Sequence, residues 1–170
     1  MIAHGRVASA VVADLTAAGW SIAVAESLTG GALTAALVDI PGASAAVRGG
    51  VVAYATDLKV SLLGVDQGLV DLTGPVDAGV AGAMAAGVRE RLGADLGVAT
   101  TGVAGPASQS GQSVGTVHLA VATRERVLTR AWVLPGGRGA IRASAVALAL
   151  ALVRSQLAEQ SGARGRYTQQ

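Results

Sequence analysis

Short apolar runs alternate with Ala-rich segments of helical periodicity along much of the chain. The runs typical of strands are residues 20–26, which we expect to be buried, and residues 49–56 and 95–102. The segments typical of helices are residues 4–18, 31–40, 57–65 and 77–92, the last with Asp77 as its expected N-cap. Such an alternation of strands and helices favours a parallel sheet covered by helices on both faces.

The last part of the chain departs from this alternation. Residues 115–123 and 126–134 are two strand-like runs separated by a short polar turn, which predicts an antiparallel pair, and a long helix is expected over roughly 140–160. We therefore predict an α/β fold, a three-layer α/β/α domain with a mixed, mainly parallel sheet. Within the 170 residues we expect a single domain at 1–162 and a flexible C-terminal tail at 163–170.

Composition narrows the possible chemistry. With no cysteine and two histidines, the chain has little from which to build a disulfide, a metal site or a Ser-His-Asp triad, so we expect neither a metal nor a cofactor. A net charge of +2 and an aromatic content of 2% argue against nucleic-acid binding.

The apolar run 143–153 is shorter than the roughly 20 residues of a membrane span, and the N-terminal segment lacks an uninterrupted apolar stretch. We expect a cytoplasmic protein without a membrane partner.

The chain contains twelve arginines but a single lysine, Lys59, which lies five residues after Tyr54. Arginine stays protonated in proteins, whereas lysine can lose its proton. A lysine retained in an arginine-rich chain is therefore either a group that arginine cannot replace or a chance remnant on the surface. The sequence alone leaves the two interpretations equally open.

Three loops follow the predicted parallel strands: ESLTGG, TDLK and TGVAGP. The carboxyl ends of parallel strands share one edge of a sheet, and open α/β folds bind their ligands at that edge. The predicted site residues in these loops are Ser27, Thr29, Gly30, Gly31, Tyr54, Lys59, Thr101, Gly102 and Gly105.

Ser27 admits two interpretations. A hydroxyl and two glycines at the start of a helix can cap that helix or cradle an anion. A nucleophilic serine instead needs a base, and the predicted site offers Lys59 or Tyr54. The neighbouring Glu26 has no second carboxylate nearby in the sequence, so we expect it to serve as a cap or turn ligand.

These motifs, in this order, resemble the CinA C-terminal domain family, the nicotinamide-nucleotide amidases. The resemblance runs over nearly the whole chain, through AESLTGG, DIPGAS, RGGVVAYATDLKVSLLGV, TTGVAGP and SVGTVHLAVA to the arginine-rich start of the last helix. It departs from the family pattern where ASQSGQS replaces a glycine-rich acidic segment. The larger molybdopterin-binding-like domain of full-length CinA proteins has no counterpart in these residues, so the chain resembles the stand-alone form.

The resemblance implies an amidohydrolase that converts nicotinamide mononucleotide to nicotinic acid mononucleotide and ammonia in pyridine-nucleotide salvage. It implies Ser27 as nucleophile, Tyr54 and Lys59 as its activating partners, and substrate contacts from Thr101 and from Arg138 or Arg142. A small-molecule nucleotide would be the ligand, and self-association into a homo-oligomer is expected. The alternatives are a non-catalytic nucleotide-binding module in a competence or DNA-damage response, and a hydrolase of another small phosphorylated substrate.

Overall fold

A five-stranded mixed sheet forms the centre of the molecule. The computed structural model describes residues 4–167, with side chains as far as residue 160. The strands are β1 (Ile22–Glu26), β2 (Val47–Val52), β3 (Leu96–Gly102), β4 (Thr116–Ala122) and β5 (Val127–Val133), and their order in the sheet is β2-β1-β3-β4-β5. The β1–β2 and β1–β3 pairings are parallel, whereas β3–β4 and β4–β5 are antiparallel. Four strands therefore run in one direction and β4 runs against them, as the predicted mixed sheet requires.

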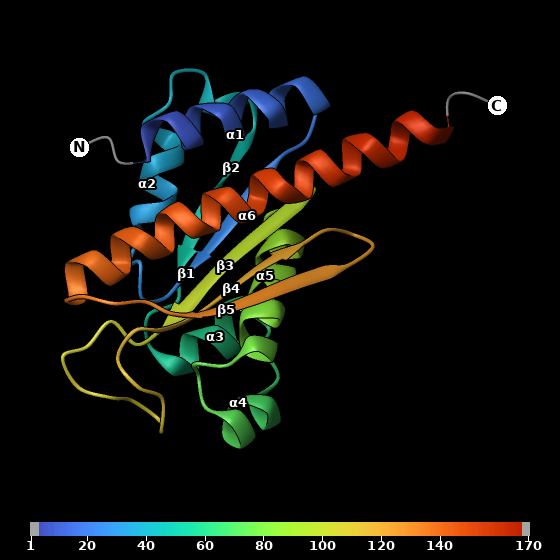
Figure 1. Cartoon of the computed structure of the whole chain (residues 1–170). Coiled ribbons are helices and arrows are strands. Elements are labelled where there is room, and N and C mark those ends of the chain that lie inside the picture. The colour runs from blue at the N-terminus through green and yellow to red at the C-terminus, as the bar shows by residue number, and fades with distance from the viewer. Residues whose placement is uncertain (1–3, 168–170) are drawn as a thin grey trace.

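Helices cover both faces of the sheet and make three layers (Figure 1). The helices are α1 (Gly5–Ala18), α2 (Ala32–Val38), α3 (Thr56–Leu63), α4 (Gln67–Thr73), α5 (Ala78–Arg91) and α6 (Arg138–Tyr167), with a 3₁₀ turn at Ala43–Ala45. One hydrophobic core lies between the sheet and α1, α2 and α6, and a second core lies between the opposite face and α3, α4 and α5. The predicted three-layer α/β/α architecture is confirmed.

The two faces of the sheet carry side chains of different size. In β1, Ile22 and Val24 point into the core under α1 and α6, whereas Ala23 and Ala25 point toward α5. In β3, a Cβ added at Gly97 would lie 1.9 Å from a backbone oxygen of α5. The small side chains let α5 approach the sheet closely, and α5 contacts β1, β3, β4 and β5.

Local sequence signals set several element boundaries. Gly19 ends α1 with φ of 65°, and Asp77 caps α5 because its Oδ1 accepts the N–H of Gly79 at 2.7 Å. The predicted antiparallel pair is β4–β5. Helix α4 was not expected from the sequence, although Asp66 marks its start by accepting the N–H of Leu69 at 2.9 Å.

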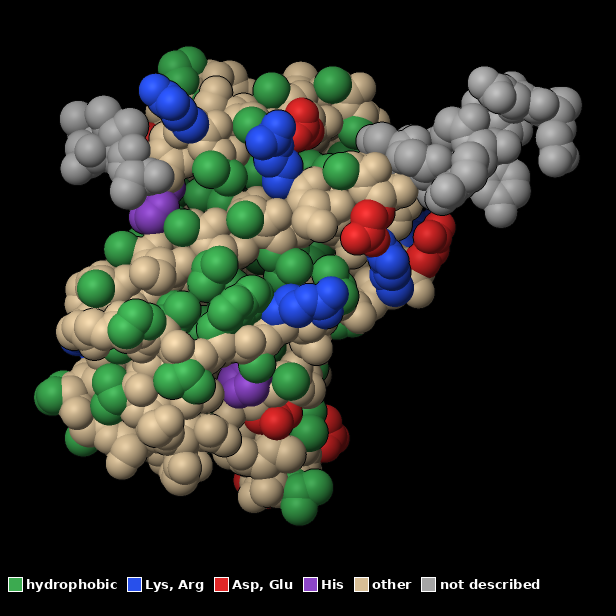
Figure 2. Space-filling model, in the orientation of Figure 1, with side chains coloured by type: hydrophobic (Ala, Val, Ile, Leu, Met, Phe, Trp, Pro, Cys, Tyr) green, Lys and Arg blue, Asp and Glu red, His purple; other side chains and the backbone are tan. Residues whose placement is uncertain are grey.

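Helix α6 is longer than expected at both ends. It begins at Arg138 and continues to Tyr167, past residue 163 where the sequence predicts a tail, and residues 168–170 of that tail lie outside the described residues. By length and composition alone, the segment Arg138–Gln160 is long and apolar enough to cross a membrane. The expectation from the sequence rested only on the apolar run 143–153, which is too short for a span. In this fold α6 packs against α1, α2, β3 and β4, and half of its most apolar window is buried. Figure 2 shows apolar side chains gathered over the middle of the visible face, whereas several basic and acidic side chains lie next to one another nearer its edges.

Candidate active site

A serine and a lysine meet at the carboxyl edge of the sheet. Ser27 is the first residue after β1, and Lys59 projects from α3, the helix that follows β2. Lys59 Nζ donates a hydrogen bond to Ser27 Oγ over 3.0 Å and a second one to the backbone oxygen of Ala53 over 2.9 Å. The two contacts fix the amine beside the hydroxyl, within the distance at which a base takes the proton of a nucleophile.

Lys59 is almost completely buried, with 1% of its surface exposed. Burial lowers the pKa of its amine to about 8, because the low-dielectric interior disfavours the ammonium form. Among the described residues no carboxylate forms an ion pair with Lys59 to counter this effect. A substantial neutral fraction is therefore present slightly above neutral pH, which a serine-activating base requires.

Glu26, rather than Ser27, caps α2. Its Oε2 accepts the N–H groups of Gly31 and Leu33 at 3.0 Å each, and its Oε1 accepts the N–H of Thr34 at 2.8 Å and the Thr34 hydroxyl at 2.6 Å. These four contacts satisfy the donors that a helix start leaves free. The expected structural role of Glu26 is confirmed, and Ser27 is not needed as a cap.

Arg142 holds the serine-bearing turn from outside. Its Nε donates to the backbone oxygen of Leu28 at 3.0 Å, and one terminal nitrogen donates to that of Thr29 at 2.7 Å. Gly30 N–H donates to the carbonyl of Ser27 at 3.1 Å. Among the described residues, the N–H groups of Leu28 and Thr29 have no protein acceptor, and of the two residues Leu28 lines the cavity described below.

The serine–lysine pair faces a small cavity of about 110 Å³. At its mouth, Arg138 donates to the Tyr54 hydroxyl at 2.9 Å and to the backbone oxygen of Gly105 at 3.0 Å, so one guanidinium links two of the three loops. Drug-sized ligands occupy pockets of roughly 300–1,000 Å³. This cavity is therefore smaller than a site that encloses a whole drug-sized ligand.

The three predicted loops do converge on this cavity. The predicted site residues that line it are Ser27, Tyr54, Lys59, Thr101, Gly102, Gly105 and Arg138. Tyr54 is 58% exposed and its hydroxyl accepts from Arg138, so among the described contacts it is Lys59 that reaches Ser27. Thr101 is buried and donates its hydroxyl proton to the backbone oxygen of Pro75 at 2.8 Å.

Four predicted site residues do not line the cavity. Thr29 is buried and its hydroxyl lies 2.7 Å from that of Thr100. Gly30 and Gly31 shape the turn with φ of 60° and 94°, and their N–H groups are bound within the protein. Arg142 donates two hydrogen bonds to backbone oxygens of the turn after β1. In this structure each of the four is bonded to other groups of the protein, and their contact with substrate stays a prediction.

Other cavity residues were not predicted: Thr56, Pro75, Val76, Ala107 and Gln109 also line it. Thr56 begins the TDLK motif, so its position next to a predicted loop residue was a usable signal. Pro75 reaches the site through its contact with Thr101, 26 residues away, and nothing in the local sequence signals that contact.

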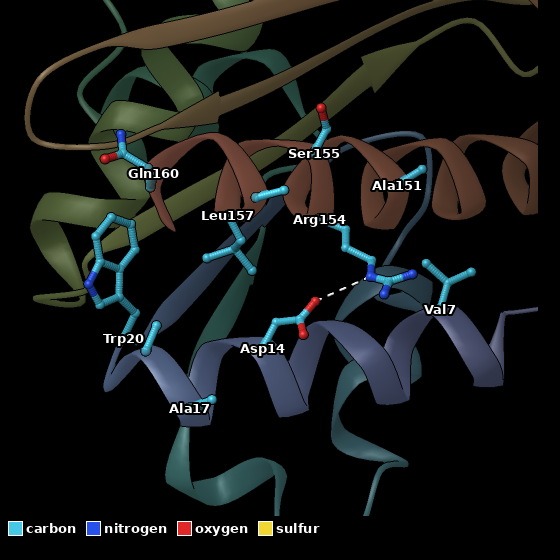
Figure 3. Close-up of a pocket in the computed structure, with 11 residues that line it drawn as sticks. Val7, Asp14, Ala17, Trp20, Ala151, Arg154, Ser155, Leu157 and Gln160 are labelled. Atoms are coloured by element: carbon cyan, nitrogen blue, oxygen red, sulfur yellow. Dashed lines mark hydrogen bonds and ion pairs between the residues drawn. The ribbon is translucent and has the colours of Figure 1, made fainter. Parts of the chain in front are cut away.

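A larger hollow of about 730 Å³ lies between α1 and α6. Figure 3 shows Trp20 and Leu157 at one end, Val7 at the other, and Asp14 and Arg154 pairing across it at 3.2 Å. It offers apolar surface and one ion pair but no nucleophile beside a base. Among the described residues no cluster of three or more potential metal ligands occurs either. The smaller cavity is the candidate active site.

Fold and site together define an α/β domain with a buried serine–lysine pair at the carboxyl edge of its sheet. The chain belongs to the CinA C-terminal domain family, whose model matches residues 4–157. It is 52% identical over 138 residues to a CinA-like protein of Frankia casuarinae, covering 81% of this chain and 32% of that protein. A CinA-like protein of Mycobacterium marinum is 47% identical over 140 residues, covering 81% and 33%. The chain thus spans about a third of the length of these curated relatives.

Solved structures of the same superfamily match over most of their length. A CinA superfamily protein from Klebsiella pneumoniae 700603 has a TM-score of 0.88 and 31% identity, covering 91% of this chain and 98% of that one. The competence/damage inducible protein CihA from Agrobacterium tumefaciens has a TM-score of 0.86 and 37% identity, covering 89% and 93%. The fold described above is therefore the family's fold.

Proposed function

We propose that this chain is an amidohydrolase that converts nicotinamide mononucleotide to nicotinic acid mononucleotide and ammonia, with Ser27 as nucleophile. The observation that carries the proposal is the 3.0 Å contact between Lys59 Nζ and Ser27 Oγ at a cavity, with a Lys59 pKa of about 8. The sequence resemblance to nicotinamide-nucleotide amidases supplies the substrate.

The proposed reaction has two stages. Neutral Lys59 accepts the proton of Ser27 while Oγ bonds to the carboxamide carbon, and the N–H group of Leu28, a residue that lines the cavity, can donate to the developing oxyanion. Such donors contribute about 3–4 kcal/mol each in enzymes where one was removed. The C–N bond breaks as Lys59 returns the proton to the leaving nitrogen, which departs as ammonia. Water then attacks the acyl ester, its proton passes through Lys59 to Ser27 Oγ, and the acid is released.

Arg138 is the proposed contact for the nucleotide phosphate. It lines the cavity and is exposed, and its terminal nitrogens bind only the neutral oxygens of Tyr54 and Gly105. A phosphate oxygen is a stronger acceptor for a guanidinium than either of these. Arg142, by contrast, is already committed to the carbonyls of Leu28 and Thr29.

Ammonia release from nicotinamide mononucleotide tests the activity. We expect turnover by the wild-type chain, loss of at least about 1,000-fold in Ser27→Ala, and little change in Ser61→Ala, which removes an exposed α3 serine bonded only to the carbonyl of Asp57. Absence of ammonia from the wild type, or equal rates for Ser27→Ala and wild type, would sink the proposal.

The dephosphorylated riboside tests the role of Arg138. The wild type should prefer the mononucleotide, and Arg138→Ala should lower that preference by about 10- to 100-fold, the range for hydrogen bonds to a charged group. Arg154→Ala is the matched control, because Arg154 lies on the same helix but pairs with Asp14 far from the cavity. An unchanged preference in Arg138→Ala would place the phosphate elsewhere.

The second candidate is a nucleotide-binding module without turnover. It is favoured by relatives and solved structures whose names refer to competence or damage, including a putative competence-damage inducible protein of Desulforamulus reducens that is 45% identical over 137 residues. Calorimetry run beside the ammonia assay separates the two. Binding of the nucleotide by wild type with no ammonia released would favour the module.

A further inference from the structure

The loop between β3 and β4 contains a tight hairpin at residues 109–112. Gln109 N–H donates to the carbonyl of Gln112 at 3.1 Å, and Gln112 N–H donates to the carbonyl of Gln109 at 2.9 Å. Between them, Ser110 and Gly111 have φ of 49° and 74°. Two successive residues with positive φ between a reciprocally bonded pair are typical of the turns that close two-residue hairpins. The backbone position of Gln109 is therefore fixed by the turn.

The tip of this hairpin rests on another wall of the cavity. A Cβ added at Gly74 would lie 3.2 Å from Cβ of Ser110, so the tip packs closely over the turn at Gly74. The next residue, Pro75, lines the cavity and accepts the Thr101 hydroxyl. The hairpin tip thus packs against the Gly74–Pro75 turn, and Gln109, although exposed, is one of the residues that line the cavity.

Gln109 differs from its neighbours in chemistry. The other residues of this loop that line the cavity are Val103, Ala104, Gly105 and Ala107. Gln109 is the polar side chain that this loop brings to the cavity, and its carboxamide can both donate and accept hydrogen bonds. This is also the segment, ASQSGQS, in which the chain departs from the family pattern it resembles.

We propose that Gln109 is a specificity-determining residue that binds the sugar hydroxyls of the nucleotide, an inference that rests on the proposed function. Ser27 and Lys59 are buried, whereas Gln109 is exposed at the rim. With the reacting carboxamide beside Ser27, the sugar and the phosphate occupy the rim. Arg138 offers a positive charge, which suits the phosphate, and Gln109 offers a neutral donor and acceptor, which suits a hydroxyl.

Two matched variants test the assignment. Gln109→Leu removes the polar group at the cavity, and Gln112→Leu makes the same change at the paired position, which does not line the cavity. Dissociation constants for nicotinamide mononucleotide are measured by calorimetry in the Ser27→Ala background, where turnover is suppressed. We expect Gln109→Leu to weaken binding about 3- to 10-fold, the worth of one or two net hydrogen bonds, and Gln112→Leu to stay within about twofold.

A 2′,3′-dideoxy analogue of the nucleotide removes the proposed partner. With this analogue, the Gln109→Leu and unsubstituted chains should bind equally, because the contact is missing in both. In the catalytically competent chain, Gln109→Leu should raise KM by a similar factor with kcat within about twofold. A purely structural defect of the hairpin would weaken binding of both ligands and would appear in Gln112→Leu as well.

The outcomes separate this inference from the proposed activity. Equal affinities for Gln109→Leu and Gln112→Leu, or a difference that persists with the dideoxy analogue, overturn the role of Gln109. A wild-type chain that binds the nucleotide without releasing ammonia refutes the amidase, while the two dissociation constants still decide the role of Gln109. A wild-type chain with no measurable affinity for the nucleotide refutes the sugar contact directly.

Discussion

Replacing Lys59 with methionine should change the pH dependence of stability in a defined way. In the unfolded chain the amine has a pKa near the ordinary 10.5, whereas burial in the fold lowers it to about 8. At about 1.4 kcal/mol per pH unit, this difference destabilises the folded state by about 3 kcal/mol at neutral pH. Methionine has a similar length and no charge, so Lys59→Met removes this contribution.

The sign of the effect follows from proton binding. Between pH 8 and 10.5 the unfolded chain holds the Lys59 proton more tightly than the folded chain does, so the free energy of unfolding rises with pH. The destabilisation is complete below about pH 8 and disappears as the pH approaches 10.5. Between pH 7 and pH 10 the wild type should therefore gain about 2–3 kcal/mol relative to Lys59→Met.

Comparing the change between two pH values is more informative than comparing the two proteins at one pH. Lys59→Met also loses the hydrogen bonds to Ser27 and to the buried carbonyl of Ala53, and an unpaired buried carbonyl costs about 1–3 kcal/mol. That loss changes little with pH, and other titrating groups contribute equally to both proteins. Both contributions therefore cancel when the difference in free energy of unfolding between the two proteins at pH 7 is subtracted from that at pH 10.

Urea unfolding of both proteins at pH 7 and pH 10 measures this quantity. Ser27→Ala is the control, because it keeps the buried amine and should follow the pH dependence of the wild type. Parallel pH dependences for wild type and Lys59→Met would show that Lys59 has an ordinary pKa in the fold. The proposed base would then be almost fully protonated at neutral pH, and the mechanism would lose its support.

Further predictions address the reaction and the packing. If neutral Lys59 is the base, kcat/KM should rise about tenfold per pH unit below about 8 and level off above it, as a pH–rate profile would show. Glu26→Gln should lower the free energy of unfolding by about 3 kcal/mol in denaturant titrations, because an amide cannot accept all four hydrogen bonds at the start of α2. The control Glu90→Gln, on the surface, should change the free energy of unfolding by less than about 0.5 kcal/mol. Gly87→Ala should lower the melting temperature by several degrees, because the new Cβ would lie 1.8 Å from a backbone oxygen of α3, while Gly139→Ala, with nothing within 4 Å, should leave it unchanged or raise it.

The main features of the fold could be predicted because each depends on local sequence. Helix starts and stops such as Asp77 and Gly19 mark α5 and α1 directly, and the apolar runs mark all five strands. Helix α4 was missed because seven residues contain too little periodicity to stand out, although Asp66 offered a capping signal. The end of α6 was placed early because the apolar run stops before the helix does.

The site was predictable at the level of loops but not of individual contacts. Arg138 and Arg142 are four residues apart on one helix, so they lie on nearly the same face and periodicity cannot assign their roles. In the structure Arg142 donates hydrogen bonds to the carbonyls of Leu28 and Thr29, whereas Arg138 lines the cavity. Gln109 could not be found from sequence, because its position depends on a hairpin packed over Gly74.

The contacts of Glu26 decide where an anion can bind in this site. The N–H groups and the positive dipole end at the start of a helix commonly hold a phosphate, and the glycines of the AESLTGG turn first suggested such a role for α2. A buried carboxylate already accepts those N–H groups, so a second anion there would meet an unpaired like charge at close range. An anionic group of the proposed nucleotide is therefore expected away from α2, where Arg138 is the arginine among the described residues that line the cavity. This arrangement leaves the turn after β1 free for chemistry: Glu26 caps the helix, Arg142 holds the carbonyls, and the hydroxyl of Ser27 needs only Lys59.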